Sequence, residues 1–279
     1  MASGSATTLF DAARAATAPA PKSTRIADRF AELRASGKRA LVPYITAGHP
    51  DMTRSIELLR GLADAGADVI ELGLPFSDPM ADGPVIQESS QRALEQGMNF
   101  DELMNLVERA EVDVPLVLFS YLNPLLAAGH DALDRAARVG LDGVLVTDLP
   151  VGSDAAREQW FADGPLAFVR LVAPTTPSDR MRAIATRGSG FVYVISRLGV
   201  TGARDDVPTD LPDTLRRLRA VTTLPICVGF GVSRPEQATA IARIADGVVV
   251  GSAIVRAAGE SVGAAVRLAA SLRTAIDAA

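Results

Sequence analysis

Two carboxylates, Glu71 and Asp82, lie in the segment ELGLPFSDPMADGP, and their setting suits acid–base chemistry. Glu71 closes an apolar run that predicts a buried strand, because the residues after Leu72 cannot continue one. Asp82 follows in a loop whose prolines stiffen the backbone and can therefore hold a side chain in place. Barrel enzymes carry their catalytic groups at strand ends and in the loops that follow. The alternative is structural, with Glu71 in a salt bridge and Asp78 and Asp82 as turn residues that hydrogen-bond their own backbone.

Glycines and a serine follow two apolar runs near the end of the chain, in VGFGVS and VGSAIV. The backbone N–H groups of Gly231, Gly251 and Ser252 could approach an anion closely, and a following helix would point its positive end at it. Ordinary strand-to-helix turns also use glycine. Two clusters at consecutive strand ends favour a phosphate site, and so a phosphorylated substrate.

A further glycine-rich stretch, SRLGVTGARDDVP, has few side chains that could pack. We predict a mobile lid over about residues 197–212, because closure over a bound phosphate would exclude water and strengthen the electrostatic interactions inside,. A merely flexible surface loop is the alternative.

These segments belong to a repeating pattern of short apolar runs and longer amphipathic segments. The runs are continuous and rich in β-branched residues, as expected for parallel strands covered on both faces. They are LVPYIT at 41, DVIEL at 68, PLVLFSY at 115, GVLVTD at 143, AFVRLVA at 167, FVYVIS at 191, PICVGFG at 225 and GVVVGS at 247. Eight strands with helices between them predict an α/β fold, a (β/α)8 TIM barrel. A doubly wound sheet would carry GxGxxG after its first strand, where this chain has AGHPD,.

We expect residues 25–279 to form one barrel domain, which a chain of 279 residues with 48% apolar residues can support,. An extra N-terminal helix, with Ile26, Phe30 and Leu33 at helical spacing, precedes the first strand,. Residues 1–24 are rich in Ala, Ser, Thr and Pro and lack the pattern of a secretory signal, which predicts a flexible tail,. No apolar stretch is as long as a membrane-spanning helix, which needs about 18 residues.

The composition narrows the classes of partner. With a net charge of -5 and no basic cluster, the chain gives no indication of a nucleic-acid surface, so small molecules or proteins are the expected partners,. The single cysteine, Cys227, lies in an apolar run and predicts a buried, reduced thiol in a cytoplasmic protein,. His49 and His130 show no ligand spacing, and we expect no protein-bound metal,.

Eight segments together resemble the α subunit of tryptophan synthase. ELGLPFSDPMADGP, SRLGVTGA, VGFGVS and VGSAIV match that family in order and spacing, and YITAGHP, YLNPLL, TDLP and APTTP are similar to it as well. The resemblance covers the chain from about residue 25 to its end. It implies a barrel that is a carbon–carbon lyase, cleaving indole-3-glycerol phosphate to indole and glyceraldehyde 3-phosphate in tryptophan biosynthesis. It also implies an α2β2 complex in which indole passes to a β subunit that holds pyridoxal phosphate, with no cofactor in this chain.

The resemblance assigns the chemistry to the opening segment. Glu71 matches the family's principal acid and base, and Asp82 its second catalytic carboxylate. Cleavage needs a proton at indole C3, a stabilised positive charge at the ring nitrogen and a base for the side-chain hydroxyl. Burial at an apolar strand would keep Glu71 protonated until it acts.

Other positions follow from the same resemblance. The expected substrate contacts are Tyr193, for which core packing is the alternative role, the apolar walls Phe119 and Leu145, and Thr201 in the lid. The expected phosphate contacts are Gly202, Gly231, Gly251 and Ser252. The expected contacts with the β subunit are Asp78, Asn123, Pro124 and Pro150.

The chain departs from the family pattern at two places, and two other functions are alternatives. His49 replaces an acidic residue, and Phe119-Ser120 replaces a more familiar pair, yet neither change removes a catalytic group. A degenerate barrel that only binds the β subunit is an alternative, which the intact carboxylates and glycines disfavour. Indole-3-glycerol phosphate synthase would need a lysine at a strand end, and Lys22 and Lys38 lie in no predicted strand.

Overall fold

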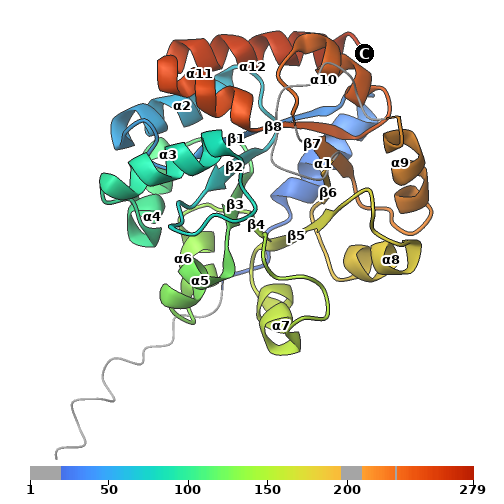
Figure 1. Cartoon of the computed structure of the whole chain (residues 1–279), viewed down its shortest axis with the longest axis horizontal. Coiled ribbons are helices and arrows are strands. Elements are labelled where there is room, and N and C mark those ends of the chain that lie inside the picture. The colour runs from blue at the N-terminus through green and yellow to red at the C-terminus, as the bar shows by residue number, and fades with distance from the viewer. Residues whose placement is uncertain (1–19, 196–208, 230) are drawn as a thin grey trace, which may run out of the picture.

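Eight parallel strands close into a barrel, which confirms the predicted fold (Figure 1). The computed structural model describes residues 20–195, 209–229 and 231–279. The strands are β1 (Ala40–Thr46), β2 (Ile70–Gly73), β3 (Leu116–Ser120), β4 (Gly143–Val146), β5 (Ala167–Val172), β6 (Val192–Ile195), β7 (Ile226–Gly229) and β8 (Gly247–Val250). Each strand pairs with the next along the chain, and β8 pairs with β1.

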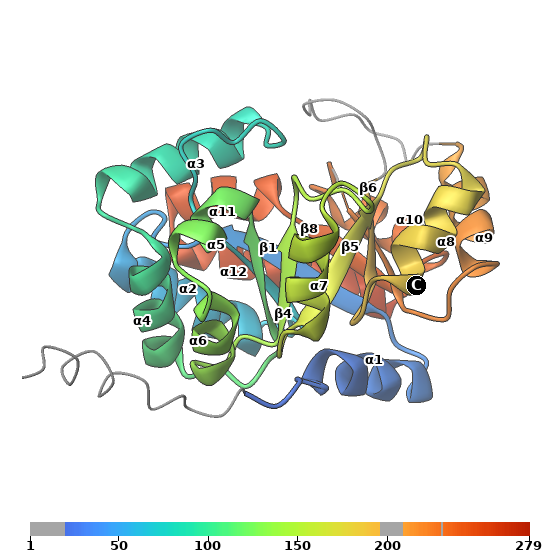
Figure 2. The same ribbon diagram turned by 90° about the horizontal axis from the view of Figure 1, so that it is seen from below.

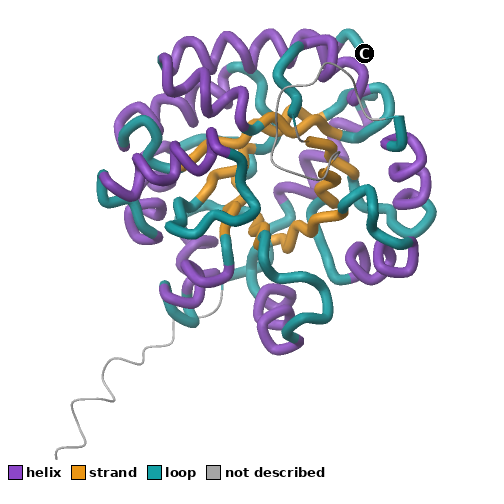
Figure 3. Tube along the Cα trace, in the orientation of Figure 1, coloured by secondary structure: helices purple, strands orange, loops and turns teal. Residues whose placement is uncertain are grey.

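Helices surround the strands as an outer ring, which Figure 3 shows in purple around the orange strands. The ring consists of α2 (Met52–Asp64), α3 (Pro84–Glu95), α4 (Phe100–Ala110), α5 (Leu122–Ala127), α6 (Ala132–Arg138), α7 (Ala155–Asp163), α8 (Ser178–Thr186), α9 (Leu211–Arg219), α10 (Pro235–Ala242), α11 (Ser252–Glu260) and α12 (Val262–Asp277), and α1 (Arg25–Ala35) lies outside it. The apolar faces of the ring helices and the outward side chains of the strands form one large buried cluster.

The predicted N-terminal helix, α1, closes one end of the barrel. Its buried residues Ile26, Phe30 and Leu33 join the apolar cluster that fills the barrel interior, and the Phe30 ring lies 5.7 Å from that of Phe191. Figure 2 shows α1 across one end of the barrel, with the loop before α3 at the other. We call the end that α1 covers the base. Of the predicted tail, residues 1–24, only residues 20–24 lie within the described part of the chain.

Four polar side chains at the base each pair with the start of the preceding strand. Asp68, Asp142, Ser189 and Asp246, which we call the base acceptors, lie just before β2, β4, β6 and β8. Their side chains accept hydrogen bonds from the N–H groups of Leu41 (2.8 Å), Leu116 (3.1 Å), Phe168 (2.8 Å) and Ile226 (2.8 Å), respectively. The N–H of each base acceptor donates in return to the carbonyl of the same partner. The N–H groups at the starts of alternate strands are thereby satisfied.

Asp68 forms more ion pairs than the other base acceptors and gives a stability prediction. Its carboxylate is 2% exposed and also binds the guanidinium groups of Arg29 on α1 and Arg273 on α12. Asp68→Ala is expected to lower the free energy of unfolding by about 3 kcal/mol, because buried donors lose their acceptor. Urea unfolding measures the loss, with Glu32→Gln as control. That variant removes only the surface ion pair to Arg29, worth at most about 1 kcal/mol,. Equal effects of the two variants would contradict the role of Asp68.

Candidate active site

Glu71 faces the barrel interior from within β2. It is paired in register with Tyr44 on β1 and Val117 on β3, so it lies inside the strand rather than at its end. The side chain is 1% exposed, and its Oε1 atom has no hydrogen-bond partner among the described residues. Glu71 forms no ion pair with any described residue, so the salt-bridge alternative has no support there. Burial raises the pKa of the Glu71 carboxyl to about 8, so the group is mostly protonated at neutral pH,.

Asp82 lies in the loop between β2 and α3 and is held by a tyrosine. The Tyr121 hydroxyl donates to Oδ2 of Asp82 (3.1 Å), and the Ala81 N–H donates to the same hydroxyl (2.9 Å). Burial raises the pKa of the Asp82 carboxyl to about 6, and the hydrogen bond from Tyr121 opposes that shift. The Asp82 carboxylate therefore accepts a hydrogen bond from a side chain at the carboxyl end of β3. The structural alternative had Asp82 bonded to the backbone of its own turn, which is a different contact. Asp78 does make a local contact, accepting from the Ser77 hydroxyl (2.7 Å).

Aromatic side chains surround the interior near Glu71. Tyr44 meets Phe119 edge to face, with ring centroids 5.2 Å apart. Tyr193 is 8% exposed, and its hydroxyl lies against Gly229 on the neighbouring strand. Of the predicted walls, Phe119 is half-buried, whereas Leu145 is fully buried in the interior cluster. Glu71 thus has rings on several sides, which suits a flat aromatic ligand.

The predicted phosphate residues are described only in part. Gly231 follows β7 with φ +85°, a conformation that favours glycine,. Gly251 is the N-cap of α11 and Ser252 its first residue, so their N–H groups lie at the positive end of that helix,. Thr201 and Gly202 lie outside the described residues, as does most of the predicted lid. At the predicted end of the lid, about residue 212, α9 begins at Leu211, which is 1% exposed.

The residues expected at a partner surface lie in loops and a short helix that follow β2, β3 and β4. Asp78, Asn123 and Pro150 are exposed, and Pro124 is half-buried. Two large apolar side chains on the same elements face solvent, Met80 at 87% and Leu126 at 39% exposure. We call these six residues the rim patch.

The described part of the chain gives no sign of another catalytic centre. It contains no group of three or more His, Cys, Asp or Glu side chains that could hold a metal ion. None of its helices is both long and apolar enough to cross a membrane.

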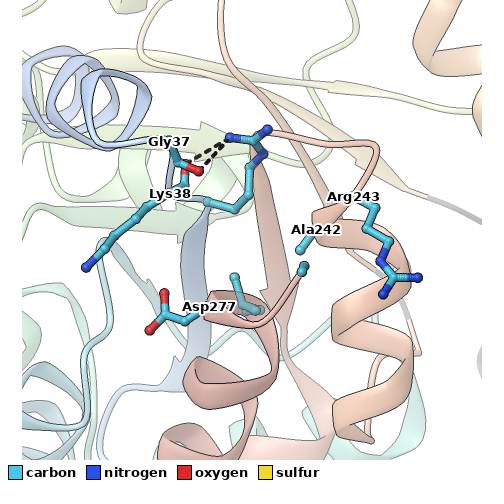
Figure 4. Close-up of a pocket in the computed structure, with 8 residues that line it drawn as sticks. Gly37, Lys38, Ala242, Arg243 and Asp277 are labelled. Carbon is cyan, nitrogen blue, oxygen red and sulfur yellow. Dashed lines mark hydrogen bonds between the residues drawn. The ribbon is translucent and has the colours of Figure 1, made fainter.

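A cavity of ≈ 410 Å³ opens at the base, where Lys38 and Arg243 point in opposite directions (Figure 4). Because these cations do not converge, the cavity is no candidate for the reaction.

Tyr44 and Tyr121 were not among the predicted site residues. Tyr121 directly follows β3, and its hydroxyl reaches a loop that begins after another strand, a contact that no local pattern reveals. The sequence contained a weak indication that Tyr44 faces the interior. Tyr44 lies on the strand next to that of Glu71 and two positions after Val42, whose side chain points inward. Inward residues alternate along a strand, so the pattern could have placed Tyr44 on the interior face.

The Tyr121 contact leads to a second prediction. Tyr121→Phe is expected to raise the pKa of the Asp82 carboxyl above about 6, because the hydrogen bond that favours its ionised form is lost,. Carbon-13 chemical shifts of the carboxyl groups, followed against pH, measure the change. Ser77→Ala serves as control, since Ser77 contacts Asp78 in the same loop. An unchanged Asp82 titration in Tyr121→Phe would show that the hydrogen bond does not matter in solution.

Known protein sequences and structures are similar to this chain. A family model described as "Tryptophan synthase alpha chain" matches residues 30–277. The chain is 46% identical over 234 residues to the tryptophan synthase alpha chain of Desulfatibacillum aliphaticivorans, covering 83% of this chain and 88% of that one. It is 47% identical over 235 residues to that of Carboxydothermus hydrogenoformans, with the same coverage. Among solved structures, the tryptophan synthase subunit alpha of Legionella pneumophila superposes with a TM-score of 0.83 at 35% identity, covering 91% of this chain and 99% of that one. A tryptophan synthase structure from Mycobacterium tuberculosis gives 0.84 at 34% identity, with the same coverage.

Proposed function

Because the chain belongs to the tryptophan synthase alpha chain family, we propose that Glu71 and Asp82 divide its lyase reaction between them. The observation that carries the proposal is the state of Glu71, a buried carboxyl inside the barrel whose Oε1 atom has no hydrogen-bond partner among the described residues. Its raised pKa of about 8 makes it a proton donor at neutral pH,. Asp82, with a pKa of about 6, is mostly ionised there.

The proposed cleavage of indole-3-glycerol phosphate begins with proton transfer. Neutral Glu71 gives its proton to C3 of the indole ring, and the positive charge that forms on the ring nitrogen is stabilised by the Asp82 carboxylate. The ionised Glu71 then takes the proton from the hydroxyl group next to the ring. As the C–C bond breaks, its electron pair returns to the ring, and the side chain leaves as glyceraldehyde 3-phosphate. Indole is released, and both carboxyl groups end as they began.

The phosphate of the substrate is proposed to bind at the loops after β7 and β8. The N–H groups of Gly231, Gly251 and Ser252 would face it, and the N-terminus of α11 adds a favourable dipole,. Thr201 and Gly202 complete the proposed set. Closure of the lid over this end would exclude water from the carboxylates.

We further propose an α2β2 complex, in which the β subunit holds pyridoxal phosphate and receives the indole. The rim patch supports this surface, because Met80 and Leu126 expose apolar area next to Asp78 and Pro124,. The whole barrel, residues 25–279, is proposed as the single catalytic domain. A cytoplasmic location is proposed with it, in keeping with the buried, unpaired Cys227,. A barrel that only binds the β subunit is less well supported, since both carboxylates are in place.

The two pKa values give a third prediction. A plot of kcat/KM against pH is expected to be bell-shaped, rising through about pH 6 as Asp82 ionises and falling above about pH 8 as Glu71 loses its proton,. The phosphate group of the substrate also titrates at about pH 6. The residual activity of Asp82→Asn distinguishes the two groups, because the substrate phosphate still titrates in that variant and the Asp82 carboxylate is absent. A flat profile between pH 5 and about 9 would contradict the assigned roles.

Release of indole from indole-3-glycerol phosphate tests the proposed function directly. The purified chain is assayed alone and with a β subunit, and glyceraldehyde 3-phosphate is measured as the second product. Equal amounts of both products, formed faster with the β subunit, are expected. Absence of indole under both conditions would exclude the lyase activity of this chain.

A further inference from the structure

Tyr44 is held in the barrel interior beside Glu71, although the mechanism above gives it no role. It lies on β1 in register with Glu71 on β2 and is 8% exposed. Phe119 packs against the Tyr44 ring at an interplanar angle of 79°, and the Cβ atom of Tyr44 faces Gly251. The ring has therefore little freedom to move.

The hydroxyl of Tyr44 lies directly against the backbone of β2. A Cβ atom added to Gly73 would come within 2.0 Å of this hydroxyl oxygen, so any side chain at position 73 would displace it. Gly73 follows Glu71 on the same face of β2, toward the loop that carries Asp82,. The hydroxyl thus occupies the level between the two carboxylates.

The electrostatic surroundings agree with that position. Burial raises the pKa of the Tyr44 hydroxyl well above its ordinary value, and the charges of Asp82 and Glu71 raise it further, while a hydrogen bond with the Thr46 side chain opposes the shift. Glu71 also raises the pKa of Tyr193, and Asp82 that of Tyr121, but among these tyrosines only Tyr44 responds to both carboxylates. Tyr44 therefore keeps its proton throughout the working pH range and can act as a hydrogen-bond donor.

The proposed reaction creates a need for such a donor. After Glu71 has protonated the ring, it is an ionised carboxylate in a buried site, and Oε1 has no hydrogen bond among the described residues. An unpaired buried charge is strongly disfavoured. The titratable groups that face Glu71 in the described part of the chain are Tyr44 on β1, Tyr193 on β6 and Cys227 on β7, with Asp82 beyond them.

We infer that Tyr44 is a positioning residue of the lyase reaction, whose hydroxyl donates a hydrogen bond to Glu71 once that carboxyl has given up its proton. The inference rests on the proposed function and adds to it a residue that acts through Glu71 rather than on the substrate. The Tyr44 hydroxyl stabilises the ionised form of Glu71 and so favours proton transfer from Glu71 to the indole ring. It also holds the carboxylate in place for the proton transfer from the substrate hydroxyl to Glu71.

Tyr44→Phe tests the inference while it keeps the ring and its contact with Phe119. The expected result is a loss in kcat of about tenfold to a hundredfold, the range for a hydrogen bond to a charged group, with KM little changed. The alkaline limb of the pH profile should move to higher pH, because the ionised form of Glu71 loses a donor. Thr214→Val, which removes a buried hydroxyl on α9, is the control and should leave kcat and both limbs unchanged.

A paired variant makes the test specific. Tyr121→Phe removes the same chemical group from Asp82 and should move the acid limb instead of the alkaline one. A Tyr44→Phe profile with an unmoved alkaline limb would overturn the inference, and so would a loss confined to KM.

Titration of the Glu71 carboxyl by infrared difference spectroscopy, in wild type and Tyr44→Phe without substrate, gives a readout that needs no turnover. A higher pKa of Glu71 in the variant supports the inference, and an unchanged pKa refutes it. Failure of the lyase assay in the wild type would instead count against the proposed function.

Discussion

Glu71→Gln is expected to lower kcat for indole formation by about 10⁴-fold, the upper end of the range for acid–base catalysis, because one carboxyl group serves both proton transfers. Glutamine has nearly the same shape and can neither give nor take the proton. Single-turnover kinetics at saturating substrate, with the β subunit present, measure the loss. Glu57→Gln on the exposed face of α2 is the matched control and should retain full activity. Retention of more than a tenth of the activity in Glu71→Gln would refute the role of Glu71.

The same substitution should stabilise the protein at alkaline pH. Burial raises the pKa of Glu71 from about 4.3 in the unfolded chain to about 8 in the fold. The folded state therefore holds a proton that the unfolded chain has lost, and the free energy of unfolding falls as the pH rises from the lower value to the higher. Glutamine does not titrate. The melting temperature of Glu71→Gln should exceed that of the wild type at about pH 8.5 and approach it below about pH 5.

Asp82→Asn is the second variant with a large expected effect. We expect a loss in kcat of about 10²-fold to 10³-fold, because the amide cannot neutralise the charge that develops on the ring nitrogen. The amide oxygen can still accept the hydrogen bond from Tyr121, so the loop should keep its place,. KM should change little.

The same kinetic assay and circular dichroism separate this effect from misfolding. Asp64→Asn, at the exposed end of α2, is the control and should behave as the wild type. If Asp82→Asn lost activity only through a higher KM, Asp82 would be a binding group and not a stabiliser of the transition state.

The barrel could be predicted well from the sequence, because each strand corresponds to a local run of apolar residues. Each run of β-branched residues became a strand, and Ile26, Phe30 and Leu33 indicated the helix that closes the base. The two carboxylates were also visible, since charged residues next to apolar runs are conspicuous. Their surroundings were not. The contacts of Tyr121 and Tyr44 depend on strand register and on loop paths, which bring together residues far apart in the sequence.

The position of Glu71 shows the same limit more closely. The glycine and proline after it suggested a strand end, whereas β2 continues to Gly73 and directs Glu71 inward. That inward orientation, and not the residue type, raises the pKa of its carboxyl. Pattern alone identifies a candidate acid, and three-dimensional burial determines its protonation.

The base acceptors lie at one end of the strands, whereas Glu71 points into the barrel interior from within β2 and Asp82 lies in the loop after that strand. Asp68 and Glu71 show the contrast within one short segment, since Asp68 connects β2 to β1, α1 and α12, while Oε1 of Glu71 has no hydrogen bond within the described part of the chain. Loss of the first should weaken the scaffold, whereas loss of the second should spare it. The side chains that hold the scaffold together are thus different from those of the proposed reaction, so a substitution in one set can leave the other in place.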